Sequence, residues 1–157
     1  LGLLDRTIPV SALLGGFVPG IKLGLANIIV VTGLYFLKLQ DICIISLLRI
    51  VISGLLFGSL MSMIYSLAGG ILSLAVMLVL KRAGQFSVVG VSMAGGVFHN
   101  VGQILAAMIV TGVPSIIYYL PILMGTGLLT GFLMGFISGR TLLILKRSSR
   151  FGQNVQK

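Results

Sequence analysis

Five long apolar segments, joined by short connections, fill most of this chain and constrain its fold more than any other feature. They cover residues 23–37, 42–60, 62–80, 88–110 and 116–145. A helix needs about 20 apolar residues to cross the hydrocarbon core of a bilayer. Because backbone groups in hydrocarbon must be hydrogen-bonded within their own segment, each segment is predicted to be a transmembrane helix. The first is short, and the last is long enough to tilt or to extend into the cytoplasm.

The positions of the cationic residues predict how these helices cross the membrane. Lys38 follows the first segment, Lys81 and Arg82 follow the third, and a basic tail at 146–157 follows the last. The intervening connections 59–61 and 111–115 carry no charge, so the positive-inside rule places the lysines and arginines in the cytoplasm. One more helix, ending near Leu4, would make six and would put both termini inside. We therefore expect an all-α, multi-pass helix bundle of one domain (1–157) in a bacterial plasma membrane.

The same composition excludes several classes of function. The net charge is +9, yet the cations are neither clustered on a soluble module nor interleaved with exposed aromatics, so no nucleic-acid partner is expected. Asp5 and Asp41 are the only acids, and the chain has neither an aspartate-rich DDxxD motif nor a GxxxxGK[ST] phosphate loop. One histidine and one cysteine do not make a metal site. We expect no enzyme activity, no cofactor and no metal.

The connection at 7–22 has an unusual composition. Pro9, Pro19 and several glycines interrupt any helix, yet the stretch stays apolar and lies on the predicted outer side. Exposed loops are normally polar. The segment is therefore either a lid over the helix bundle or a loop resting among the lipid headgroups.

Arg49 lies about two turns inside the second apolar segment. A cation at this depth costs a few kcal/mol unless it is paired or hydrated. Ser46 and Ser53 share its helix face, whereas Asp41 is about two turns away. Arg49 therefore either faces an anionic ligand or a water-filled cavity, or extends to the cytoplasmic headgroups.

A second group of polar residues lies in the fourth segment. His99 and Gln103 share a predicted helix face with Gly95 and Gly102, and Asn100 lies about 100° around the helix. These three side chains could form one wall of a polar cavity. Alternatively, each is satisfied by a neighbouring helix, as polar groups in membrane helices often are.

Lys22 stands where the connection 7–22 becomes a helix, and Asn27 lies further along that helix. An interfacial lysine is usually an anchor. Its predicted position on the outer side runs against the charge bias, so a role at the mouth of a cavity is the alternative.

Glycine recurs at every fourth position of the last segment, at Gly127, Gly131, Gly135 and Gly139. This spacing places the four on one helix face and lets another backbone approach closely. We expect this face to pack within the bundle, with an external partner as the alternative.

Four stretches of the chain, PGIKLGLANI, LLRIVISGLLFGSL, SLAGGILSLAVM and FSVVGVSMAGGVFHNVGQILAA, resemble the Gx transporter family. This family is often labelled heptaprenyl diphosphate synthase component I and is grouped with the S components of energy-coupling factor (ECF) importers. Such S components have six helices, capture a vitamin or similar solute outside, and close the loop after helix 1 over it. The resemblance implies three protein partners, a transmembrane coupling subunit and two ATPase subunits.

Together these expectations describe a membrane S component that binds a small anionic or amphipathic solute, vitamin-like or isoprenoid-like. Six residues are its candidate ligands: Lys22, Asn27, Arg49, His99, Asn100 and Gln103. The alternative is a non-catalytic membrane accessory subunit of heptaprenyl diphosphate synthesis, whose basic cytoplasmic face would suit diphosphate groups or an acidic partner.

Overall fold

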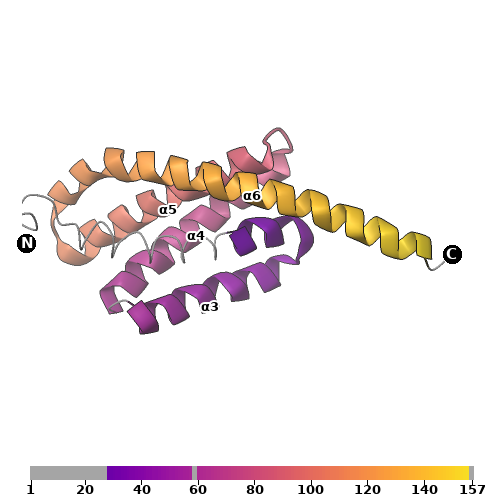
Figure 1. The fold of residues 1–157 in the computed structure, drawn as a ribbon. Helices are drawn as coiled ribbons and strands as arrows, with labels where there is room; N and C mark the ends of the chain where they lie inside the picture. Colours follow the sequence, from indigo (N-terminus) through magenta and orange to yellow (C-terminus); the bar gives the residue numbers. More distant parts are fainter. Residues whose placement is uncertain (1–27, 58–59, 156–157) are drawn as a thin grey trace, which may run out of the picture.

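The computed structural model describes residues 28–57 and 60–155, and every regular element within these ranges is helical. A helical segment at 28–36 comes first (Figure 1). It is followed by α3 (Leu39–Phe57), α4 (Leu60–Ala83), α5 (Val88–Thr111), the 3-10 helix η1 (Pro114–Tyr119) and α6 (Leu120–Val155). The predicted all-α fold is confirmed.

Within the described residues, three stretches are long and apolar enough to cross a membrane: Leu60–Ala83, Val88–Thr111 and Pro114–Arg147. They correspond to the third, fourth and fifth predicted segments. The second predicted segment, 42–60, corresponds to α3. This helix of 19 residues begins and ends three residues earlier than expected. The six-helix count and the connection 7–22 involve residues outside the described ranges and stay predictions.

The ends of α5 are set by the two residues that flank it. Ser87 has an extended backbone, and its Oγ accepts a hydrogen bond of 3.1 Å from the amide of Gly90. This satisfies a donor that the first helical turn leaves without a partner. At the other end Gly112 adopts a left-handed conformation with φ 67°, and its amide donates to the carbonyl of Met108. Glycine ends helices in this way because it has no Cβ to clash.

The last predicted segment differs from the structure at both ends. Pro114 opens η1, and Pro121 lies in the first turn of α6. An N–H group in the first turn has no intrahelical acceptor, so proline, which lacks this group, breaks no hydrogen bond there. The helix then continues to Val155, through most of the basic tail. Its 36 residues correspond to about 54 Å, well beyond a hydrocarbon core of about 30 Å. Figure 1 shows this end of α6 extending past the other helices.

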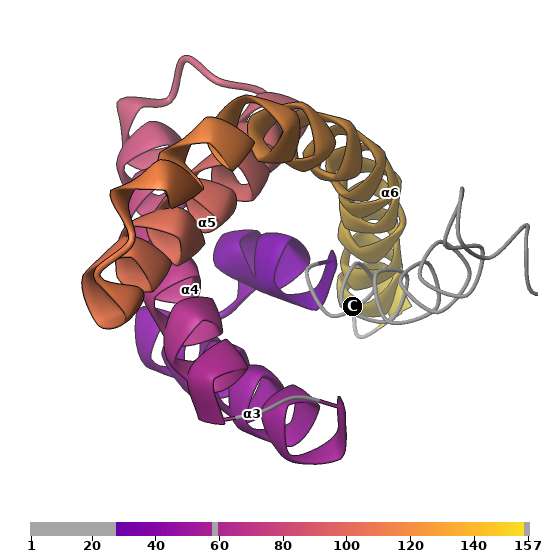
Figure 2. The same ribbon diagram turned by 90° about the vertical axis from the view of Figure 1, so that its left-hand side faces the viewer.

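The helices α3, α4, α5 and α6 form an arc around the helical segment 28–36 (Figure 2). Val31 and Leu34 of this segment are fully buried in a cluster with Ile42 of α3, Met77 of α4 and Val91 of α5. The short segment therefore forms the centre of the apolar core. Many large apolar side chains point outward instead, as expected where lipid replaces water around a bundle.

Glycines allow α5 to pack closely against both of its neighbours. On the α6 side, a Cβ added to Gly127 would lie 2.7 Å from the carbonyl oxygen of Gly96. A Cβ on Gly131 would lie 2.6 Å from the Cα of Met93, so these backbones touch. Gly135 likewise meets the backbone of α5, whereas Gly139 meets no described atom within 4 Å. Three of the four predicted packing glycines thus lie at the interface of α5 and α6.

The face of α5 that packs on α4 is built from a different set of small residues. A Cβ on Gly102 would lie 2.8 Å from the Cα of Gly69. The Oγ of Ser73 donates a 2.8 Å hydrogen bond to the carbonyl of Gly95. This combination of close backbones and a hydroxyl bond is typical of helix packing in membranes.

The cationic connections lie at one end of the bundle. The Nζ of Lys81, at the end of α4, donates to the carbonyl of Leu34 and lies 5.4 Å from the centre of the Tyr35 ring. Figure 1 shows the connections that contain Lys38 and follow Lys81 at the same end as the extended part of α6. The uncharged connection between α5 and η1 lies at the opposite end. The charges are therefore segregated as expected, while the orientation across a membrane stays a prediction.

Candidate functional site

Arg49 lies on the part of α3 that faces α4. One turn earlier, Ser46 is buried, and its Oγ would lie 4.0 Å from a Cβ added to Gly70 of α4. The Arg49 side chain is half-buried in this region. Its positive charge acts on the imidazole of His99, which comes from α5. The structure thus brings two of the candidate residues, from different helices, within electrostatic range of each other.

His99 lies where α5 crosses α4 at Gly69. The imidazole is half-buried. A Cβ on Gly69 would lie 3.1 Å from Nδ1 of His99, so any larger residue there would push the ring aside. The glycine on α4 is therefore what lets the imidazole lie against this helix.

Gln103 lies one turn after His99 on the same face of α5. Its Cγ would be 2.9 Å from a Cβ on Gly69, so its stem packs on the same glycine. The side chain is half-buried. His99 and Gln103 therefore share the α4 side of α5, as their spacing predicts.

Asn100 faces a different neighbour. Its amide nitrogen donates a hydrogen bond to the carbonyl of Leu123 on α6. The same nitrogen would lie 2.8 Å from a Cβ on Gly127. Asn100 thus joins α5 to α6, whereas His99 and Gln103 face α4. Of the expected three-residue wall, two side chains lie together and the third links α5 to α6. Lys22 and Asn27 lie outside the described residues.

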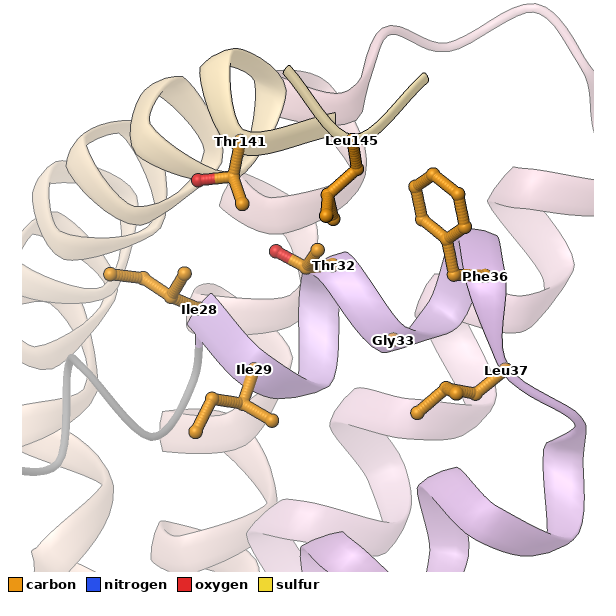
Figure 3. Close-up of a pocket in the computed structure, with 8 residues that line it drawn as sticks. All are labelled: Ile28, Ile29, Thr32, Gly33, Phe36, Leu37, Thr141 and Leu145. Atoms are coloured by element: carbon orange, nitrogen blue, oxygen red, sulfur yellow. The ribbon is translucent and has the colours of Figure 1, made fainter. Parts of the chain in front are cut away.

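A groove that was not predicted from the sequence lies between the helical segment 28–36 and α6 (Figure 3). It has a volume of about 300 Å³, and neither Arg49 nor His99 is among the residues that line it. Eight residues line it: Ile28, Ile29, Thr32, Gly33, Phe36, Leu37, Thr141 and Leu145. Its two threonines are ordinary in apolar helices, so no sequence signal distinguishes them.

The described residues contain no group of three or more histidines, cysteines or acids that could hold a metal ion. Arg49, His99 and Gln103 offer hydrogen-bonding groups, and Arg49 also offers a positive charge. A guanidinium offers several donors in a fixed plane, which suits carboxylate and phosphate groups.

A comparison with models of known families identifies the family of this chain. The family model described as Heptaprenyl diphosphate synthase component I matches residues 1–141. The chain belongs to this family. The match covers all of the described helices up to the middle of α6, which form the arc in Figure 2. The extended end of α6 lies beyond the match. No curated protein and no solved structure matches the chain.

Proposed function

We propose that this member of the Heptaprenyl diphosphate synthase component I family captures a small anionic or amphipathic solute, as the S component of an ECF importer does. The observation that supports the proposal is the electrostatic proximity of Arg49 on α3 and His99 on α5. A guanidinium and an imidazole from different helices lie within electrostatic range of each other inside an otherwise apolar bundle. An anion at this place would accept charge-assisted hydrogen bonds from the guanidinium of Arg49.

The surrounding residues support binding of a polar solute. Gln103 adds an amide one turn from His99, and Ser46 adds a hydroxyl one turn from Arg49. Few polar residues occur inside a membrane bundle, and those that do occur usually mark substrate or ion pathways. In this proposal Lys22 and Asn27 complete the site from the outer side, and the connection 7–22 closes over it.

Transport would require an energy source from elsewhere. The chain has no phosphate-cradling GxxxxGK[ST] loop, so in this proposal two ATPase subunits and a membrane coupling subunit supply the energy. The three partners and the multi-pass placement in the plasma membrane, with both termini in the cytoplasm, belong to the proposal.

A second candidate function follows from the family description. The family is described as a component of heptaprenyl diphosphate synthase. The chain would then be a non-catalytic membrane subunit that recruits the soluble synthase. The cationic end of the bundle, with Lys38, Lys81 and Arg82, would suit an acidic protein or diphosphate groups.

Purification of the tagged chain from its native membrane distinguishes the two functions. The importer predicts co-isolation of a membrane coupling subunit and two ATPases, identified by mass spectrometry. Co-isolation of a soluble prenyl diphosphate synthase without ATPases would favour the accessory subunit and would contradict the importer. A variant with Arg49→Ala serves as the matched control, because it should retain the protein partners while losing the solute.

A further inference from the structure

The groove in Figure 3 has the chemistry of a site for a hydrocarbon chain. Ile29, Phe36, Leu37 and Leu145 line it and are each between 42% and 56% exposed. Apolar residues exposed along a membrane helix face acyl chains. The groove runs along the helical segment 28–36 and α6, so it would hold a chain roughly parallel to the helices.

Two of the residues that line this groove are followed by lysines. Leu37 and Leu145 line the groove, and each is followed directly by an exposed lysine, Lys38 and Lys146. The two lysines come from different elements, since Lys38 belongs to the connection before α3 and Lys146 to α6. An apolar groove with lysines next to two of its lining residues matches a ligand with a chain and an anionic head.

The groove also contains two hydroxyl groups. The Oγ1 of Thr32 is buried and has no hydrogen-bond partner among the described residues. The Oγ1 of Thr141, across the groove, donates 2.9 Å to the carbonyl of Ile137 on its own helix. Thr32 would donate to a ligand acceptor after rotation about its Cα–Cβ bond. A buried hydroxyl without a partner is unfavourable, so an acceptor at this depth would be stabilising.

We propose that this groove binds one anionic glycerophospholipid, with an acyl chain along α6 and its phosphate between Lys38 and Lys146. The ester carbonyl that follows the phosphate would accept the hydrogen bond from Thr32. An isoprenoid diphosphate has the chain and the charge but lacks this carbonyl, so the groove fits a glycerophospholipid better. This inference does not depend on the proposed solute site.

The chain contains no tryptophan, so one introduced indole reports on the groove alone. Phe36→Trp places it in the groove, and Phe86→Trp is the matched control. Phe86 is 49% exposed against 46% for Phe36, lies outside the groove, and belongs to the connection at the same end of the bundle. Each variant is placed in vesicles that contain either dibrominated phosphatidylglycerol or dibrominated phosphatidylcholine, and bromine quenching of the indole is measured.

At Phe36→Trp we expect the anionic lipid to compete about tenfold better than the zwitterionic one, because each lysine near a headgroup favours anionic lipid. Replacing both lysines, Lys38→Ala with Lys146→Ala, should remove that preference. Phe86→Trp follows Lys81 and Arg82, so any preference there should be the same in both backgrounds. Circular dichroism of each variant checks that the helices are retained.

Three results would overturn the proposal. Equal quenching by the two lipids at Phe36→Trp would remove the headgroup selectivity. Absence of quenching by either lipid would show that protein covers the groove. Relief of quenching by geranylgeranyl diphosphate at equimolar ratio to the anionic lipid would assign the groove to an isoprenoid instead.

Discussion

The imidazole of His99 on α5 lies against Gly69 of α4, where an added Cβ would be 3.1 Å from Nδ1, and the charge of Arg49 on α3 acts on the same ring. Three helices thus converge on one side chain. Asn100, the next residue on α5, points to α6 and donates to Leu123. Neighbouring polar residues of one helix therefore differ in their surroundings, and this difference makes their roles separable.

His99→Ala should affect solute retention, whereas Asn100→Ala should affect the stability of the bundle. His99→Ala should weaken retention of the bound solute by roughly ten- to a hundredfold, since a hydrogen bond to a charged group contributes about 1.5–3 kcal/mol. Asn100→Ala should leave retention unchanged and lower the free energy of unfolding by about 0.6–1.7 kcal/mol, the range measured for polar contacts between membrane helices. Native mass spectrometry of the solute-bound fraction and denaturant titration in micelles measure the two quantities. Loss of solute from Asn100→Ala alone would contradict this division.

The glycine face of α6 predicts a contrast between two alanine substitutions. Gly131→Ala adds a Cβ that would lie 2.6 Å from the Cα of Met93, so it should lower the free energy of unfolding by about 1–3 kcal/mol through overpacking. Gly125→Ala on the same helix meets no described atom within 4 Å and should be neutral or should stabilise by up to about 1 kcal/mol. Thermal unfolding in detergent measures both. Equal stability of the two variants would show that α5 and α6 do not touch at Gly131.

Lys81 should stabilise the attachment of the helical segment 28–36. Its Nζ donates to Leu34 and lies over Tyr35, so Lys81→Met should lower the free energy of unfolding by about 1–2 kcal/mol. Arg82→Met, at the adjacent exposed position, is the control for loss of one surface charge. If the two variants unfold alike, the bond to Leu34 contributes nothing measurable.

The proposed orientation is testable with single cysteines. In a Cys43→Ala background, Ser115→Cys should react with a membrane-impermeant maleimide added to intact cells, because it follows the uncharged connection. Gln85→Cys, which follows Lys81 and Arg82, should react only after lysis. The reverse pattern would invert the proposed topology.

The sequence predicts the helices themselves well where local signals mark their ends. The predicted segment 88–110 differs from α5 by one residue, because Ser87 and Gly112 cap it. The end of α6 was not predicted because the polar residues after Leu145 include no proline and no glycine until Gly152. Charge alone marks that stretch as a tail, although its residues are compatible with a helix.

Relationships between helices could be predicted only in part. Spacing places His99 and Gln103 on one face and Asn100 on another, and the structure agrees. Spacing does not say which helix covers each face, so the electrostatic proximity of Arg49 and His99 could not be derived. The groove beside Thr32 arises from the placement of the segment 28–36 against α6, which is a tertiary property without a local sequence signal.

The most direct test compares the small molecules that remain bound to the purified wild-type chain, to Arg49→Ala and to Arg82→Ala in lipid nanodiscs. Mass spectrometry after denaturation identifies and counts these molecules. We predict that one anionic compound other than a phospholipid accompanies the wild type and Arg82→Ala at near-stoichiometric amounts and is lost from Arg49→Ala. Equal occupancy in all three, or no anionic compound with the wild type, would contradict a solute site at Arg49 and His99.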